Sequence, residues 1–200
     1  TSVSDPMGGA ALPRQNLFAF DATTGEVSRT LAPQVNGRVT QLLPGPTADT
    51  VYVAVRFNKI NGRGPNHIQL VDVNTGQSVR SFKAPATNGA IQALQQLPGN
   101  RIFIGGSFTK VGGVPNGQIV SLNATTGALD PFLNLTATSR HNTSSGARGA
   151  IGPRESAVTP AGDRLVVVGN FRYVDGQSRD QIVMIDLTGP TASVVTNWYT

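Results

Sequence analysis

The sequence contains no cysteine, which excludes disulfide bonds, zinc sites with thiolate ligands and cysteine nucleophiles. Only 6% of the residues are aromatic, 14% are charged and two are histidine. No apolar run approaches the ~18 residues that a transmembrane helix needs, so no membrane span is expected. Windows rich in Ala, Leu, Glu and Lys with a period of 3.6 residues are missing as well, so the sequence does not favour long amphipathic helices.

Glycine and proline are abundant, with 23 and 13 residues among 200. This composition is typical of many short strands joined by tight turns, and it predicts an all-β protein. The formal net charge of +5 could favour anionic partners. The basic residues are scattered, however, without runs of three or more and without interleaved aromatic residues. A nucleic-acid partner is therefore not expected.

An internal repeat of 51 residues dominates the sequence. Asp21, Asp72 and Asn123 precede similar Thr-Gly turns at intervals of 51 residues, and Asp186 follows after a further 63. A second set of anchors has the same spacing and consists of Phe57, Phe108 and Phe171, each followed by a glycine at Gly62, Gly113 or Gly176. The chain therefore has two regular units and one unit with 12 additional residues, which we place in the polar stretch 136–150.

Each repeat contains four strand-like runs, which in the second copy cover residues 90–97, 101–108, 118–122 and 128–133. The second run of each copy is apolar at consecutive positions, which predicts a strand buried on both faces. An antiparallel four-stranded unit of this length, unable to bury both faces alone, predicts a blade of a β-propeller. A β-prism or a β-solenoid remains an alternative, although their repeats are usually shorter or differently stranded.

The repeat divides the chain into segments. We expect a tail or degenerate strand at 1–11, the outer half of a blade at 12–35, full blades at 36–86, 87–135 and 151–200, and an inserted loop at 136–150. About three and a half blades do not close a ring, because propellers usually have about 4–8 blades. The sequence is therefore expected to be part of a larger ring whose remaining blades lie in the same chain or in another.

One segment resembles a known family. Residues 102–132, IFIGGSFTKVGGVPNGQIVSLNATTGALDPF, resemble the delta-60 repeat propeller in their Gly-Gly-x-Phe and Ile-x-x-Leu patterns, and their GALDPF is similar to its Gly-x-Leu-Asp-x-x-Phe pattern with one residue fewer before the Phe. Ala54 and Val55 replace the glycine pair in the first copy, and Thr188-Gly189-Pro190 shifts the last turn. The resemblance implies a secreted or surface-attached bacterial protein, and the Arg-rich, Lys-poor composition is similar to that of actinobacteria. It implies no catalytic residues.

The residues offer little for catalysis. The only glutamates, Glu26 and Glu155, do not fall on repeated strand positions, and the repeated Asp residues are expected to form turns. Asp72–Gly76 resembles the opening of a calcium loop but lacks its bidentate Glu, so a turn is favoured. His67 and His141 are far apart without a third ligand, so neither metal nor cofactor is expected. An alternative is a hydrolase or lyase whose catalytic residues lie in other blades.

Binding is the remaining class of function. Loops on a rigid β-scaffold commonly carry recognition residues. The candidates are Arg140, His141 and Arg148 in the insertion, and Arg56, Ser107 and Asn170 immediately before the repeated Phe. We therefore expect a non-enzymatic, secreted or cell-surface scaffold that binds carbohydrate or another protein chain. A structural component of a surface assembly is the second alternative.

Overall fold

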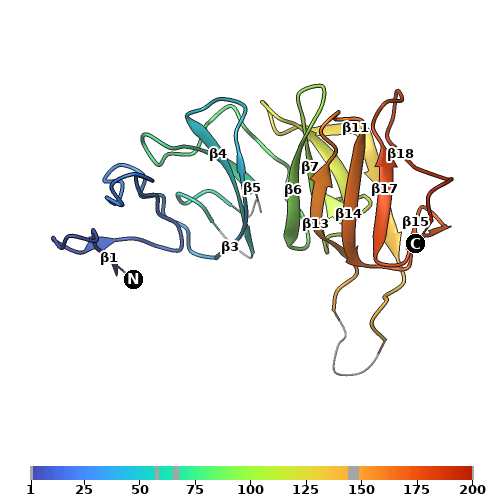
Figure 1. Ribbon diagram of the computed structural model, residues 1–200, viewed down its shortest axis with the longest axis horizontal. Helices are drawn as coiled ribbons and strands as arrows, with labels where there is room; N and C mark the ends of the chain where they lie inside the picture. The colour runs from blue at the N-terminus through green and yellow to red at the C-terminus, as the bar shows by residue number, and fades with distance from the viewer. Residues whose placement is uncertain (1, 57–58, 65–67, 144–148, 200) are drawn as a thin grey trace.

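The computed structural model describes residues 2–56, 59–64, 68–143 and 149–199. Phe57, His67 and Arg148 lie outside the described residues. Within them every regular element is a strand, and none is a helix that could span a membrane. Three antiparallel sheets stand side by side in chain order, with the two termini at opposite ends of the array (Figure 1). The predicted all-β fold class is confirmed.

The second blade has the four expected strands. They are β6 (Ile91–Leu97), β7 (Arg101–Gly106), β10 (Ile119–Asn123) and β11 (Leu129–Leu135), in the spatial order β6-β7-β10-β11. Gly99 and Asn100 both have positive φ in the turn between β6 and β7, as tight hairpin turns require. β7 and β10 are buried on both faces, which explains their unbroken apolar sequence.

The third blade repeats this arrangement, and the first departs from it. The third contains β13 (Gly152–Val158), β14 (Arg164–Asn170), β17 (Ile182–Asp186) and β18 (Ser193–Val194). The first contains β3 (Arg38–Pro44), β4 (Thr50–Arg56) and β5 (Ile68–Asp72). Its expected fourth strand is reduced to a bridge between Val71 and Ser78. The chain turns there because the Phe82 N–H donates to the Val79 carbonyl and the Phe82 ring enters the core.

Short hairpins connect the second and third strands of the later blades. They are β8 (Lys110–Val111) with β9 (Val114–Pro115), and β15 (Tyr173–Val174) with β16 (Gln177–Ser178). Their two-residue turns end at Gly113 and Gly176, and an equivalent turn in the first blade ends at Gly62. Both turn residues have positive φ in each case, as in a type I′ turn. The repeated glycines thus have a conformational cause.

Two regions outside the blades complete the fold. β1 (Ser2–Val3) pairs with β2 (Leu12–Pro13), and a bridge between Phe20 and Val27 marks a hairpin in the N-terminal half-blade. β12 (Ala137–Thr138) pairs with β15. Residues 137–138, predicted as part of a loop, therefore belong to a small sheet instead. The reason is that Ala137 is buried in the hydrophobic core of the second and third blades.

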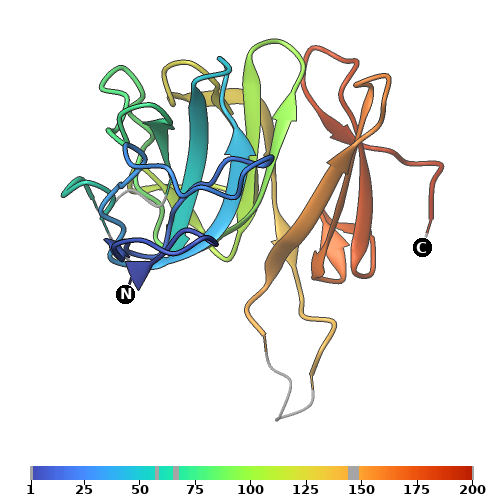
Figure 2. The same ribbon diagram turned by 60° about the vertical axis from the view of Figure 1, so that its left-hand side comes forward.

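The blades pack face to face through apolar side chains. Tyr52 and Ala54 of the first blade pack in one cluster with Ile102 and Ile104 of the second. On the other face of β7, Phe103 packs with the third blade. The first strands of the three blades, β3, β6 and β13, are neighbours and form the inner edge of the array (Figure 2). Without its two neighbours, the second blade would expose the apolar side chains on both of its faces.

Candidate functional site

The site lies at one end of the blades, where β3, β6 and β13 begin and β4, β7 and β14 end. We call it the insertion end, because residues 139–143 and 149–150, which are described parts of the insertion, lie there. Figure 1 shows the described residues on either side of the insertion leaving β12 and entering β13 at this end of the sheets. Loops at such a position are held by a rigid scaffold and are free to carry recognition residues.

Each inner strand has an irregularity close to this end. The register between β3 and β4 shifts at Thr40, that between β6 and β7 at Gln92, and that between β13 and β14 at Arg154. An extra residue in one strand bends that strand and re-aims a side chain. A bulge at the same place in three blades thus directs Thr40, Gln92 and Arg154 towards one cavity.

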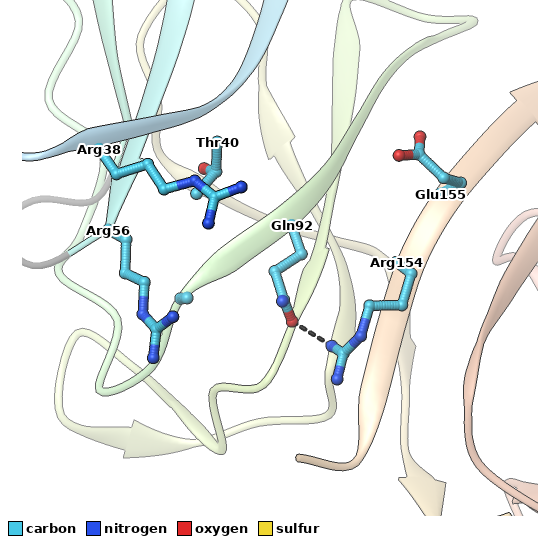
Figure 3. Close-up of a pocket in the computed structure, with 7 residues that line it drawn as sticks. Arg38, Thr40, Arg56, Gln92, Arg154 and Glu155 are labelled. Carbon is cyan, nitrogen blue, oxygen red and sulfur yellow. Dashed lines mark hydrogen bonds between the residues drawn. The ribbon is translucent and has the colours of Figure 1, made fainter. Parts of the chain in front are cut away.

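These side chains line a cavity of about 230 Å³, which we call the arginine cavity. Its lining consists of Arg38, Thr40, Arg56, Ala90, Gln92, Arg154 and Glu155 (Figure 3). Arg38 and Arg56 are direct partners across β3 and β4. Like charges directly opposite each other in an antiparallel pair are destabilising, so this placement works against the stability of the sheet. Thr40 donates to the Ile91 carbonyl at 2.8 Å and joins the first two blades.

Arg154 is held by neutral acceptors. Its Nη1 donates to Gln92 Oε1, the dashed contact in Figure 3, and its Nη2 donates to the Ala150 carbonyl at 2.8 Å. Burial lowers the pKa of the Arg154 guanidinium, because the charged form loses hydration. Glu155 is exposed and directed away from this guanidinium. Within the described ranges neither Arg38 nor Arg154 forms an ion pair.

The three candidates that precede the repeated Phe all lie at the insertion end. Arg56 and Ser107 line an adjoining cavity of about 390 Å³ together with Arg154. Asn170 is only 9% exposed, and its side chain accepts the His141 N–H at 3.1 Å and donates to the Gly149 carbonyl at 3.0 Å. The side-chain amide of Asn170 therefore holds both ends of the insertion against β14 by hydrogen bonds.

The described insertion candidates, Arg140 and His141, do not line these two cavities. Arg140 is exposed and lines neither the arginine cavity nor the adjoining one. His141 places Nδ1 2.8 Å from Asp180 Oδ1. The structure thus brings Arg56 and Ser107 together with Arg154, but not with the described insertion residues Arg140 and His141. Arg148 falls outside the part of the chain that the structure describes.

The repeated Asp and Asn residues cap turns at the opposite end of the blades. Asp21 Oδ1 accepts the backbone N–H groups of Thr23 and Thr24, each at 2.8 Å. These bonds lower the pKa of the Asp21 carboxyl, with that from Thr24 contributing most. Asp72 and Asn123 accept equivalent pairs of bonds. Among the described residues no three His, Asp or Glu side chains gather closely enough to hold a metal ion.

Residues 98–132 match a family model described as "Domain of unknown function (DUF5122) beta-propeller". The match runs from the turn before β7 into β11, so it covers most of the second blade. The sheets are blades of a β-propeller. A comparison with curated proteins gives no match. The predicted propeller fold is confirmed, and the similarity carries no information about a ligand.

Proposed function

We propose that the protein is a non-enzymatic binding scaffold of the delta-60 repeat type, acting outside the cytoplasm as a secreted or cell-surface protein. Its ligand is carbohydrate or a protein partner, held at the insertion end. One observation carries the proposal: bulges in three successive inner strands direct Thr40, Gln92 and Arg154 into a single cavity. Bulges are features that proteins use to re-aim side chains at sites.

The chemistry of the cavity supports binding rather than turnover. Glycoside hydrolysis commonly uses two carboxyl groups that face the bond to be cleaved, about 5–9.5 Å apart. The lining of the arginine cavity includes one carboxylate, Glu155, and it is directed away from Arg154. The other polar side chains of the described lining carry guanidinium, amide and hydroxyl groups, and these groups hold a ligand by hydrogen bonds.

The test is binding of the chain to immobilised neutral glucan, polygalacturonate and dextran sulfate, measured for two matched glutamine variants. Gln92→Ala removes the acceptor that positions Arg154, so we expect clearly weaker binding. Gln96→Ala is the control, because Gln96 lies on the same strand at the opposite end and donates to the Pro44 carbonyl at 2.9 Å. We expect this variant to bind like the unmodified chain.

Two results would contradict the proposal. Loss of binding in Gln96→Ala with full binding in Gln92→Ala would place recognition at the other end of the blades. Shortened polysaccharide chains after incubation, detected by mass spectrometry, would show turnover and overturn the non-enzymatic interpretation.

Assembly between chains is a second candidate function, favoured by the exposed apolar side chains Phe18, Phe20 and Val168.

A further inference from the structure

Positive charge in the arginine cavity comes from two blades. Arg38 and Arg56 reach it from β3 and β4 of the first blade, and Arg154 reaches it from β13 of the third. β6 of the second blade runs between them and contributes Gln92 (Figure 3). Arg154 follows Arg38 by 116 residues and Arg56 by 98 residues in the sequence, so the fold brings guanidinium groups from distant segments to one place. The convergence is a product of the fold and not of a basic run in the sequence.

The charges of Arg38 and Arg154 have little local compensation among the described residues. The ion pairs of the described residues use Arg29, Arg101, Arg164 and His141, and none of them includes Arg38 or Arg154. Glu155 is the one carboxylate among the described residues of the lining, and its side chain is directed away from the Arg154 guanidinium. Pairing Arg38 directly opposite Arg56 adds repulsion that a purely structural sheet end would avoid.

Arg154 is also preorganised. Its two Nη atoms are fixed by Gln92 Oε1 and by the Ala150 carbonyl, which are neutral acceptors. A partly buried charge whose partners are neutral loses hydration without gaining a countercharge. An anion arriving beside it would supply that countercharge without any need to order the side chain first. Preorganisation of this kind raises affinity because fewer groups are immobilised on binding.

Size and lining indicate the ligand class. A cavity of about 230 Å³ is smaller than the ~300–1,000 Å³ typical for a whole small-molecule ligand, so it suits one charged group. The planar guanidinium fork matches the oxygens of carboxylate, sulfate and phosphate. The adjoining cavity shares Arg56 and Arg154 and adds Ser107, so neighbouring groups of one ligand would fit side by side. None of the described residues that line the two cavities is aromatic, whereas single-stranded nucleic acid is usually held by stacking on aromatic side chains.

We propose that the arginine cavity is an oxyanion site, in which Arg38, Arg56 and Arg154 hold a carboxylate or sulfate group carried by an anionic polysaccharide. This inference rests on the proposed scaffold function and names the ligand class of the same site. The polysaccharide chain continues across the adjoining cavity towards the insertion, and its next charged group lies beside Ser107.

The experiment is isothermal titration calorimetry of the chain with inorganic sulfate, dextran sulfate, polygalacturonate, neutral dextran and a single-stranded DNA oligonucleotide. We expect both anionic polysaccharides to bind, inorganic sulfate to bind more weakly at the same site, and neutral dextran not to bind. Affinity for dextran sulfate should fall steeply as the salt concentration rises from about 50 to about 500 mM, because exposed charges are screened.

Charge-neutral variants locate the site. Arg38→Gln and Arg154→Gln should each weaken dextran sulfate binding by about tenfold, the typical loss for one charged hydrogen bond. Arg154→Lys should retain part of the affinity, because the charge stays but the fork is lost. Arg80→Gln is the matched control, since Arg80 is exposed and does not line the cavity, and it should bind like the unmodified chain. Circular dichroism and the melting temperature identify any variant that fails to fold.

The failures of the two proposals are distinguishable. Equal binding of neutral dextran and dextran sulfate, or full affinity in a folded Arg154→Gln variant, would overturn the oxyanion site and leave the scaffold function standing. Tighter binding of the DNA oligonucleotide than of dextran sulfate would contradict the proposal that the bound anionic group belongs to a polysaccharide. Absence of binding to inorganic sulfate and to both anionic polysaccharides would overturn the inference. Absence of binding to neutral dextran as well would count against a carbohydrate scaffold.

Discussion

Tyr52 connects the first two blades through a single side chain. It is fully buried in β4, its hydroxyl donates to the Ala124 carbonyl after β10, and its ring lies 5.4 Å from that of Phe82. Burial raises the pKa of the Tyr52 hydroxyl to about 12, because the phenolate would lose its hydration. A tyrosine at this place is thus both a packing residue and a hydrogen-bond donor between blades.

We expect Tyr52→Phe to lower the free energy of unfolding by roughly 1–3 kcal/mol, since the Ala124 carbonyl loses its partner. Because the folded-state pKa of Tyr52 is raised, the stabilisation is complete below pH 10 and is lost as the pH rises from 10 to about 12. Urea unfolding at neutral pH and in that window measures both effects. Tyr173→Phe is the control, because Tyr173 is 41% exposed, and an equal loss in both variants would contradict the hydrogen bond's role.

Turns explain why the repeat is visible in the sequence. Gly127 follows the Asn123 cap with φ +77°, and Gly113 ends the β8–β9 turn with φ +82°. The two glycines have the same backbone conformation but different surroundings. A Cβ added to Gly127 would lie 2.6 Å from the backbone nitrogen of Ala84, whereas one added to Gly113 would meet no atom within 4 Å.

Replacing these glycines separates conformational strain from close packing. Gly113→Ala should cost about 1–2 kcal/mol of folding free energy, from the left-handed backbone alone. Gly127→Ala should cost roughly 1–3 kcal/mol more, because the chain at Ala84 must move. Thermal and urea unfolding of the two variants provide the comparison. Equal losses would show that the approach of Ala84 to the turn does not contribute.

The same turns account for how much of the fold could be predicted from the sequence. The strands of the second blade were expected at 90–97, 101–108, 118–122 and 128–133, and β6, β7, β10 and β11 begin within about one residue of these positions. Turn glycines and alternating burial are local properties, so they leave a local pattern. The short strand at Ala137–Thr138 was missed because its partner, β15, lies 35 residues further along the chain.

The candidate site was predicted only in part, for a related reason. Arg56 and Ser107 align on the repeat anchors and were found, but Arg38 and Arg154 were not. Thr40, Gln92 and Arg154 are spaced by 52 and 62 residues, whereas the anchors are spaced by 51 and 63. An alignment on the anchors therefore does not superimpose the bulges. The bulges superimpose only when β3, β6 and β13 are compared on their own spacing.

The whole array has one apolar face at each end. In the second blade, Phe103 is buried against the third blade, but its equivalent in the third blade, Val166, is partly exposed, and Val168 on the same face is 36% exposed. At the N-terminal side, Phe18 and Phe20 are 43% and 61% exposed. These side chains lie on the two faces through which successive blades pack in the middle of the array.

We expect the 200-residue chain to associate head to tail at increasing concentration, because unlike faces at opposite ends form a heterologous contact. Val168→Lys should reduce this association, since it places a charge in the apolar face. Leu42→Lys is the control, because Leu42 is also exposed but lies on the inner strand β3. Sedimentation velocity of the three proteins is the measurement. Identical association in all of them would mean that this face of the third blade does not mediate contacts.

Recognition at the insertion end is most directly tested by nuclear magnetic resonance of the arginine side chains during titration with dextran sulfate. The arginines serve as reporters over the whole surface, since Arg101 and Arg164 lie at the opposite end of their strands from the cavity. We expect the Nε–Hε signals of Arg38, Arg56 and Arg154 to shift together and to saturate together. Shifts centred on Arg101 and Arg164, with these three unchanged, would contradict a binding site at the insertion end.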